Sequence, residues 1–235
     1  MVGQFADRRD AGRVLASQLH AYHSRANCLV LGLPRGGVPV AYEVALSLAL
    51  PLDVFLVRKL GVPGHEELAM GAIAEGGIRF LNRSLIAELH IPEVAVEEVT
   101  RREFLELERR AREYRDGRPS PRVLGHTVIL VDDGLATGAT TLAAVAALRQ
   151  MTPEKIVVAV PVGSSEACAE VERQVDQIVC AIMPPTFHAV GMWFADFEPT
   201  TDAEVRNLLG LAAQRTLRRD HGHTERTASD EAGMP

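Results

Sequence analysis

Three short aliphatic runs, separated by helix-length segments, restrict the fold of this chain more than any other feature. The runs are HTVILV from residue 126, KIVVAVPV from residue 155 and QIVCAIM from residue 177. The segments between them, 139–150 and 164–176, are predicted helices. Strands that alternate with helices pair in parallel and are covered by helices on both faces. The sequence therefore predicts an α/β fold with a mostly parallel sheet flanked by helices.

The first half of the chain continues the same alternation. CLVLGL (28–33) and DVFLVRK (53–59) are predicted strands, and VPVAYEVALSLAL between them is a predicted helix. A further helix is expected after Asp7, whose carboxylate suits a helix N-cap. IRFL (78–81) is a predicted short strand. Right-handed crossovers then place the carboxyl ends of the parallel strands on one edge of the sheet, where such folds bind ligands.

Three segments do not follow the alternation. Residues 60–77 contain five glycines without a clear period, so we expect a long mobile loop there. Residues 92–115 form a predicted charged helix, and the tail after Gln214 is polar, aperiodic and predicted to be disordered. Oppositely charged residues four positions apart predict ion pairs along the charged helix, namely Glu97/Arg101, Glu98/Arg102, Glu106/Arg110 and Glu108/Arg112.

Composition excludes several classes of protein. The 235 residues are 47% hydrophobic, which is enough for a sizeable core, and the net charge of −6 argues against a nucleic-acid-binding protein. The most apolar region, 28–57, is interrupted by Arg35, Glu43 and Asp53, so we expect no membrane span. The three cysteines lack metal-ligand spacing, which indicates reduced thiols and a cytoplasmic location.

The stretch VILVDDGLATGATTL (128–142) is the strongest candidate for a site. Asp132 and Asp133 end a buried strand, which is costly unless their charges are neutralised or hydrogen-bonded. The loop that follows is suited to an anion, because Gly138 permits a tight turn, Thr137 and Thr140 carry hydroxyls, and the next helix begins with free N–H groups. A ligand with ribose hydroxyls beside a phosphate would suit both the two carboxylates and the anion-binding loop. The alternative is a strand-to-helix turn without a ligand.

Other nucleotide-binding motifs fit poorly. The sequence has no Gly-Lys-Ser/Thr of a Walker loop, and no Gly-x-Gly-x-x-Gly opens a helix after a strand.

The stretch resembles the 5-phosphoribosyl-1-diphosphate (PRPP) signature of type I phosphoribosyltransferases. The resemblance implies a type I phosphoribosyltransferase-like fold with a small hood subdomain. It implies that Asp132 and Asp133 hold the ribose hydroxyls. It also implies that the 5-phosphate is bound by Ala136, Thr137, Gly138, Ala139 and Thr140.

Two further segments agree with this resemblance. LPRGG (33–37) stands where the family binds pyrophosphate, which implies Arg35 as a cationic donor and close backbone approach at Gly36 and Gly37. A plain strand-to-helix turn is the alternative. Lys59, at the end of the second predicted strand, would contact the diphosphate. Residues 60–77 are similar to the family's mobile catalytic loop, whose candidate polar groups here are His65, Glu66 and Glu67.

Over residues 5–210 the chain looks like a bacterial group of phosphoribosyltransferase-like proteins, in a stand-alone form without fused domains. The segments that carry this resemblance are FADRRDAGRVLASQL, LPRGGVPVAYEVA, RKLGVPGHEELAMGAIAEGG and WFADFEPTTDAEV. We expect a domain over 1–213, hood elements at 82–122 and 184–213, and a disordered tail at 214–235. A homodimer is an open alternative to a monomer.

The resemblance implies transfer of the phosphoribosyl group from PRPP to a nitrogenous, purine-like heterocycle, with release of pyrophosphate. The catalytic candidates are Asp132, Asp133, Lys59 and Arg35, and Mg²⁺ is the expected cofactor, held mainly by substrate oxygens rather than by protein ligands. Phe187, Trp193 and Phe194 are acceptor-binding candidates, because aromatic faces stack on bases. A hydrophobic plug is their alternative role. A PRPP-sensing regulatory protein and a nucleotide or PRPP hydrolase are the competing functions.

Overall fold

A five-stranded parallel sheet forms the centre of the protein. The computed structural model describes the backbone of residues 4–231 and the side chains of residues 4–216. The strands lie in the order β2-β1-β6-β7-β8. Their bounds are β1 (Cys28–Gly32), β2 (Leu52–Val54), β6 (Thr127–Val131), β7 (Lys155–Val162) and β8 (Gln177–Ile182). The α/β fold with a parallel sheet flanked by helices, expected from the sequence, is confirmed.

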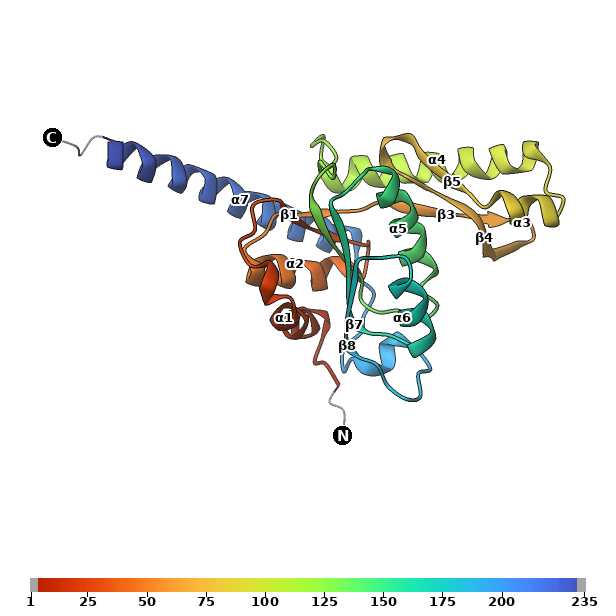
Figure 1. Ribbon diagram of the computed structural model, residues 1–235, viewed down its shortest axis with the longest axis horizontal. Coiled ribbons are helices and arrows are strands. Elements are labelled where there is room, and N and C mark those ends of the chain that lie inside the picture. Colours follow the sequence, from red (N-terminus) through yellow and green to blue (C-terminus); the bar gives the residue numbers. More distant parts are fainter. Residues whose placement is uncertain (1–3, 232–235) are drawn as a thin grey trace.

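Helices cover both faces of this sheet (Figure 1). On one face lie α1 (Arg8–Gln18) and α2 (Gly37–Leu48), and on the other α5 (Ala139–Gln150) and α6 (Ser165–Glu172). Because successive side chains of a strand point to opposite faces, each aliphatic run supplies both cores. In β6, Ile129 and Val131 belong to the cluster under α1 and α2, whereas Val128 and Leu130 belong to the cluster under α5 and α6. The continuous aliphatic runs follow from this two-sided burial.

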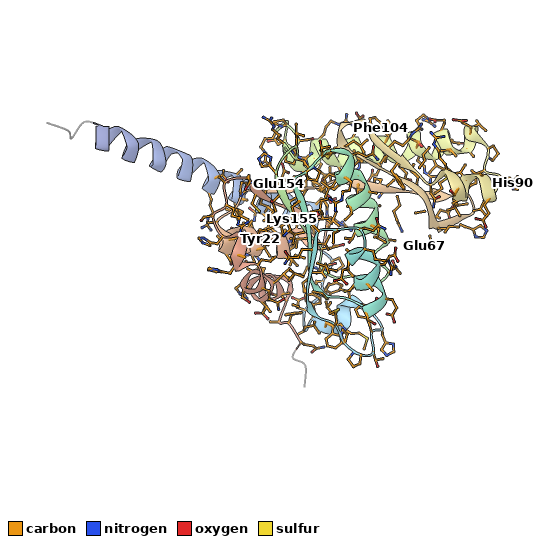
Figure 2. The ribbon with its side chains drawn as sticks, viewed as in Figure 1. Tyr22, Glu67, His90, Phe104, Glu154 and Lys155 are labelled. Atoms are coloured by element: carbon orange, nitrogen blue, oxygen red, sulfur yellow. The ribbon has the colours of Figure 1, made fainter. Side chains whose placement is uncertain are left out.

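A second, antiparallel sheet lies beside the central one, in the order β3-β4-β5 (Figure 1). Its strands are β3 (Val57–Val62), β4 (His65–Ala74) and β5 (Ile78–Leu81), and helices α3 (Arg83–Glu88) and α4 (Glu93–Arg115) follow. Glu67 and His90 lie in this part, away from Tyr22 and Lys155 in the central layer (Figure 2). The predicted hood segment, 82–122, contains α3 and α4. It follows directly on β3, β4 and β5, which the sequence analysis did not assign to the hood.

The prediction of one strand over 53–59 is wrong. The chain leaves the central sheet after Val54 and enters the second sheet at Val57. Phe55 and Leu56 between the two strands are buried, with exposed fractions of 2% and 3%. The apolar run is continuous, so its period cannot reveal that the strand changes sheets. Arg58 and Lys59 consequently lie in the antiparallel sheet and not at the end of a parallel strand.

The prediction of a loop over 60–77 is also wrong in its secondary structure, because most of the segment is the β3–β4 hairpin. Two glycines permit close approach of neighbouring strands. A Cβ on Gly61 would lie 2.7 Å from the Glu66 carbonyl oxygen, and one on Gly71 would lie 2.3 Å from the Phe80 carbonyl oxygen. Gly64, Gly76 and Gly77 have positive φ angles and form turns. The glycines that suggested a loop are thus used for strand packing and turns.

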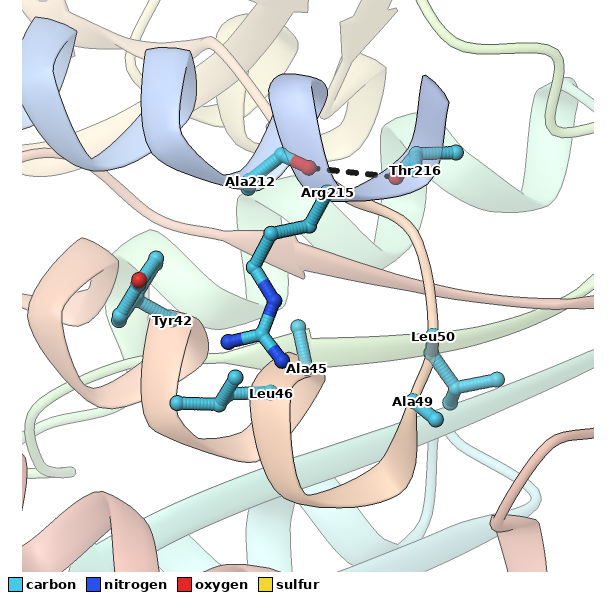
Figure 3. Close-up of a pocket in the computed structure, with 8 residues that line it drawn as sticks. All are labelled: Tyr42, Ala45, Leu46, Ala49, Leu50, Ala212, Arg215 and Thr216. Atoms are coloured by element: carbon cyan, nitrogen blue, oxygen red, sulfur yellow. Dashed lines mark hydrogen bonds between the residues drawn. The ribbon is translucent and has the colours of Figure 1, made fainter. Parts of the chain in front are cut away.

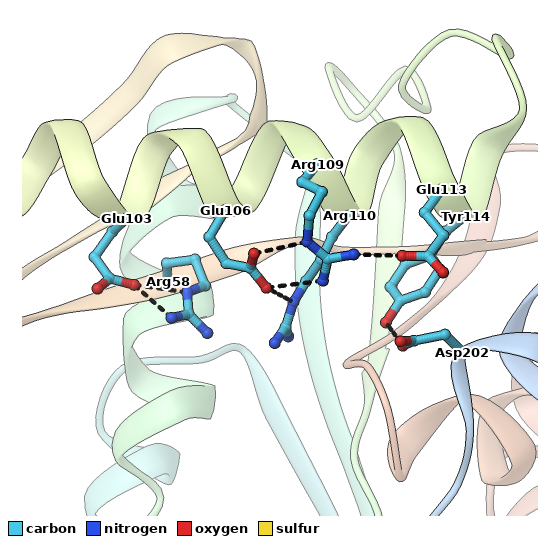
Figure 4. A network of polar contacts seen from close by, with 8 residues as sticks. All are labelled: Arg58, Glu103, Glu106, Arg109, Arg110, Glu113, Tyr114 and Asp202. Atoms are coloured by element: carbon cyan, nitrogen blue, oxygen red, sulfur yellow. Dashed lines mark hydrogen bonds and ion pairs between the residues drawn. The ribbon is translucent and has the colours of Figure 1, made fainter.

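Helix α4 carries ion pairs along its length (Figure 4). Of the four predicted pairs, only Glu106 with Arg110 is formed among the described side chains, at 2.8 Å. Other charges pair within the helix at different spacings, as Arg109 does with Glu106 and Glu113, or find partners on other elements, because tertiary neighbours compete with local spacing. Arg58 of β3 donates to Glu103, and Tyr114 donates to Asp202 (Figure 4). These contacts attach α4 to the hairpin and to the start of α7.

Helix α7 (Asp202–Glu231) extends away from the rest of the protein at its far end (Figure 1). Its beginning packs near α2, α4 and β2, where Val205, Leu208 and Leu209 are fully buried. The helix continues to Glu231, so the predicted disordered tail differs from the structure up to that residue. Residues 232–235 of that prediction lie outside the described residues.

Short 3₁₀ segments complete the described part of the chain, namely η1 (His20–Tyr22), η2 (Glu75–Gly77) and η3 (Val190–Trp193). Within the described residues, no helix has the length and apolar character needed to cross a bilayer.

Candidate functional site

Two loops meet at the carboxyl edge of the central sheet. Strands β1 and β6 are neighbours, and their last residues, Gly32 and Val131, are paired in register. The loop that follows β1 (33–36) and the loop that follows β6 (132–138) therefore start side by side. Crevices at this edge of a parallel sheet are the usual ligand sites of such folds.

Gly36 and Gly37 lie directly against the acidic pair. A Cβ built on Gly36 would come within 1.9 Å of Asp133 Oδ2, and a Cβ on Gly37 would lie 2.9 Å from the Asp132 Cα. Any side chain at position 36 would thus displace the Asp133 carboxylate. The structure brings together the two segments that the sequence had singled out separately. It also places a cis peptide bond between Pro34 and Arg35.

The two aspartates are partly buried and electrostatically coupled. Asp132 Oδ1 accepts a hydrogen bond from the Asp133 backbone N–H at 2.9 Å, and its Oδ2 lies 3.5 Å from the hydroxyl of Thr141. Burial, together with the neighbouring Asp133 carboxylate, raises the pKa of Asp132 well above its ordinary range. Burial also raises the pKa of Asp133, and the Arg8 guanidinium opposes this rise. Such perturbed carboxylates at a sheet edge are typical of binding sites.

Sequence reasoning missed Arg8, which is the cationic partner of this pair. Its Nε donates to Asp133 Oδ2 at 2.9 Å, and the two side chains are only 11% and 19% exposed. Arg8 is in the first turn of α1, where the helix dipole disfavours a cation. Two cations, Arg8 and Arg9, follow the N-cap Asp7, and this irregularity marks the first turn without distinguishing Arg8 from Arg9. The contact itself spans 125 residues and is tertiary.

The loop that follows the aspartates is shaped for an anion. Gly138 has a φ of +71° and precedes α5, whose first backbone N–H groups point back toward the loop. Thr137 Oγ1 accepts from the Ala139 N–H at 3.4 Å, and Ser164 Oγ donates to the Ala136 carbonyl at 3.0 Å. Thr140 is exposed in the first turn of α5. The predicted phosphate-binding residues thus form one turn at the start of a helix.

The two cationic residues predicted for the site, Arg35 and Lys59, lie in different parts of the structure. Arg35 lies in the loop between β1 and α2. Lys59 Nζ lies 3.9 Å from Glu67 Oε2 across the β3–β4 hairpin. Neighbouring Arg58 is held by Glu103 and, with Pro34, Thr140 and Arg110, lines a small cavity between the loops and α4. The second sheet therefore lies beside both loops, although no contact joins Lys59 to the aspartates among the described side chains.

The polar candidates of the hairpin, His65, Glu66 and Glu67, are exposed at the beginning of β4. They follow the turn at Pro63 and Gly64. A contact with a ligand stays a prediction for all three residues, as does movement of the hairpin.

The acceptor candidates divide into two groups. Phe187 is half-buried and, with His188, Ala136 and Thr137, lines an open pocket of about 520 Å³ beside the phosphate loop. Phe194 is only 4% exposed and packs on Phe5, with ring centroids 5.5 Å apart, so it cannot offer a face to an acceptor in this structure. Trp193 packs against the same cluster. The plug interpretation therefore holds for Phe194.

The segment that carries these aromatic residues covers the acidic loop. A Cβ on Gly134 would lie 2.6 Å from Val190 Cγ1. Phe197, further along the segment, lies under the Arg8 guanidinium at 3.8 Å.

Another pocket, of about 270 Å³, lies between α2 and α7 (Figure 3). Arg215 reaches from α7 toward α2, and Thr216 donates to the Ala212 carbonyl (Figure 3). Ala49 and Leu50 line it at the end of α2, which is the end away from the carboxyl edge of the sheet. This pocket is therefore separate from the two loops.

The surroundings of the aspartates fit a hard cation that a diphosphate would bring with it, because they offer oxygen atoms and Mg²⁺ prefers oxygen. The described residues contain no group of three or more His, Cys, Asp or Glu side chains that could hold a metal ion by themselves. We assign no protein ligand to the ion.

Comparison with known proteins gives a consistent result. A family profile described as "Phosphoribosyl transferase domain" matches residues 2–190. Two Mycobacterium tuberculosis proteins, from strains CDC 1551 and H37Rv, bear the name "Putative phosphoribosyl transferase". Each is 47% identical over 208 residues, which cover 88% of this chain. The matched region spans about half (47%) of the length of these relatives.

A solved structure is also similar, the crystal structure of TT1426 from Thermus thermophilus. It superimposes with a TM-score of 0.80 at 43% identity, over 88% of this chain and 97% of that one.

Proposed function

Since the chain belongs to the phosphoribosyl transferase domain family, we propose that it moves the 5-phosphoribosyl group of PRPP to a nitrogen atom of a heterocyclic, purine-like base. Pyrophosphate is the second product. The proposal concerns the region of 235 residues, which corresponds to about half the length of its curated relatives.

One observation carries the proposal, namely the packing of the Gly36–Gly37 turn against Asp132 and Asp133. PRPP has a diphosphate and two ribose hydroxyls on adjacent carbon atoms, so its site needs anion-binding backbone next to carboxylates. The turn after β1 supplies the anion-binding backbone, and the end of β6 supplies the carboxylates. The phosphate-shaped loop at 136–140 follows the aspartates directly in the chain, so one ligand can reach all three parts.

The residues have complementary roles in this proposal. Asp132 and Asp133 accept hydrogen bonds from the ribose hydroxyls, and their negative charge offsets the positive charge that grows on the ribose as the bond to pyrophosphate breaks. Arg35 and Lys59 stabilise the departing diphosphate, together with the backbone N–H group of Gly36, whereas the Gly37 N–H donates to the Leu33 carbonyl at 3.0 Å within the turn. When it is bound, Mg²⁺ would supply further stabilisation of diphosphate charge.

The acceptor would lie near Phe187 and Trp193, beside the anomeric carbon and opposite the leaving group. Phe187 lines the open pocket next to the phosphate loop and has a partly exposed ring, which supports its role as a stacking surface. The buried Phe194 would then support this surface from behind.

The decisive experiment incubates the protein with PRPP, Mg²⁺ and a panel of purine, pyrimidine and other nitrogen bases, and follows pyrophosphate release. Release that depends on one base, with formation of its nucleotide, is the expected result. Release without any base would identify a hydrolase instead. Binding of PRPP without release would indicate a sensor, and the absence of binding would contradict the proposal.

A further inference from the structure

The N-terminal segment is part of the surface that holds the aromatic acceptor segment. Phe5 forms a parallel bridge with Phe194. The Phe5 N–H donates to the Trp193 carbonyl at 2.9 Å, and the Ala195 N–H donates back to the Phe5 carbonyl at 2.8 Å. The Asp196 N–H donates to the Ala6 carbonyl at 3.0 Å. Residues 5 and 6 thus hold residues 193–196 through one isolated bridge and these backbone hydrogen bonds.

Arg8 follows this bridged segment and makes three contacts with one guanidinium group. Nε donates to Asp133 at 2.9 Å, Nη1 donates to the Glu198 carbonyl at 2.7 Å, and the group lies over the Phe197 ring at 3.8 Å from its centroid. A planar guanidinium can serve two acceptors and stack at once, which the point charge of a lysine cannot do. The side chain therefore connects the donor-side carboxylate to the acceptor segment.

The charges around Asp133 make this connection important. The charged groups that act on it are Asp132 next to it and Arg8 from α1. Burial raises the pKa of Asp133, and Arg8 is the group that lowers it. Without Arg8, the pKa of Asp133 would rise further, and a protonated carboxyl group cannot accept from ribose hydroxyls through both oxygens.

We propose that Arg8 is a positioning residue that couples the two substrate sites: it orients the Asp133 carboxylate toward the ribose and anchors the Phe197–Glu198 segment over the acceptor. This inference rests on the proposed function for the identity of the substrates. The contacts themselves exist without a ligand, which allows a separate test.

The test compares Arg8→Gln and Arg8→Lys with Arg9→Gln as the matched control. Arg9 is the next residue of α1, but its side chain is 44% exposed and lies 3.6 Å from Glu43 rather than near the site. Mg²⁺–PRPP binding is measured by calorimetry from pH 6 to pH 9. Arg8→Gln should weaken binding by about tenfold or more at pH 7, and the loss should shrink as the pH rises. Arg8→Lys should lie between Arg8→Gln and the wild type, and Arg9→Gln should match the wild type.

Two readouts in the ligand-free protein keep the inference separate from the proposed function. In Arg8→Gln, the ¹³C chemical shift of the Asp133 carboxyl group should titrate at higher pH than in the wild type. The amides of Ala195 and Asp196 should exchange with deuterium faster, and both should be unchanged in Arg9→Gln. The wild-type protein could fail to bind PRPP while Arg8→Gln still shows the higher Asp133 titration and the faster amide exchange. In that case the proposed function fails and the coupling by Arg8 stands. An unchanged Asp133 titration with unchanged amide exchange in a folded Arg8→Gln protein overturns the inference.

Discussion

At the scale of single residues, the site depends on close approach between backbone and carboxylates. Gly36 has no space for even a methyl group, because the nearest atom to its Cβ position is Asp133 Oδ2 at 1.9 Å. The same carboxylate is held by Arg8. Asp133 is therefore confined between a glycine and an arginine, and its position is sensitive to either neighbour.

Gly36→Ala should abolish measurable PRPP binding while the protein stays folded, because the Asp133 carboxylate must move away from the turn. Gly210→Ala is the matched control, since Gly210 is in α7 and, apart from the helix's own backbone, no atom of the described residues lies within 4 Å of its Cβ position. That substitution should raise helix stability by about 1 kcal/mol at most and leave binding intact. Calorimetry with Mg²⁺–PRPP and thermal unfolding of both variants test this. Wild-type affinity in Gly36→Ala would show that the turn does not contact the site.

Asp132→Asn should make the ligand-free protein more stable at neutral pH and should weaken PRPP binding. The folded-state pKa of Asp132 is raised, so the folded protein holds this proton more tightly than the unfolded chain does. Its contribution to stability is fully present below about pH 4, the unfolded pKa, and is lost as the pH rises toward the folded pKa. The variant has no such loss. We expect a gain of roughly 0.5–2 kcal/mol at pH 7 that disappears in acid, measured by urea unfolding against pH. A variant that is less stable at pH 7 than the wild type would contradict this expectation.

At the scale of elements, the β3–β4 hairpin is held over the loops by its attachment to α4. Glu103 is only 9% exposed and accepts from Arg58 at 2.8 Å, whereas Glu106 pairs with arginines of its own helix. The arginines beside Glu106 lower the pKa of its carboxyl to about 2, yet ion pairs near the surface contribute little to folding. Glu103 is more deeply buried than Glu106, so the two carboxylates should respond differently to substitution.

Glu103→Ala should lower the free energy of unfolding by about 1–3 kcal/mol, because it leaves Arg58 partly buried without its partner. Glu106→Ala, one turn further along α4, should cost less than about 1 kcal/mol. Urea unfolding gives both values, and hydrogen exchange over residues 57–74 shows whether the loss is local to the hairpin. Equal effects of the two substitutions would mean that Arg58 and Glu103 do not attach the hairpin.

At the scale of the whole molecule, one buried arginine joins the second sheet and α4 to the central layer. Arg115 at the end of α4 is 3% exposed and contacts Asp53 of β2 at 3.1 Å. It also donates to Glu75 of η2 and, at 2.7 Å, to the Val54 carbonyl. Burial of the guanidinium opposes its charged form, but the two carboxylates outweigh this effect and raise its pKa. The contact lies where the chain passes from one sheet to the other.

Arg115→Met should destabilise the protein by about 3–5 kcal/mol, because Asp53 and Glu75 would be left as uncompensated, partly buried charges. Arg112→Met is the control on the same helix, since Arg112 is exposed and its replacement should cost about 0.5 kcal/mol or less. Denaturant unfolding measures both. A loss below about 1 kcal/mol for Arg115→Met would show that the two layers are held together by apolar packing alone.

The central sheet and the acidic loop were predictable because their signals are local. Five aliphatic runs that alternate with helical segments predict a parallel sheet, and Asp132 with Asp133 follows one of them directly. The glycines of residues 60–77 led to a wrong prediction, because a glycine that allows strands to approach looks the same in sequence as a glycine in a loop. The sequence could not place Phe194 for a similar reason, since an aromatic side chain suits both a stacking surface and the buried cluster in which Phe194 lies.

The sequence alone thus determined the fold class, the order of the central elements and the acidic loop. Tertiary structure alone decided the sheet change after Val54, the partner of Arg58 and the contact of Arg8 with Asp133. Periodicity and motifs indicate which side chains of a segment are buried and which contacts they make with residues nearby in the sequence. The partner of a charge 125 residues away depends on how complete layers pack, and no local pattern carries that information.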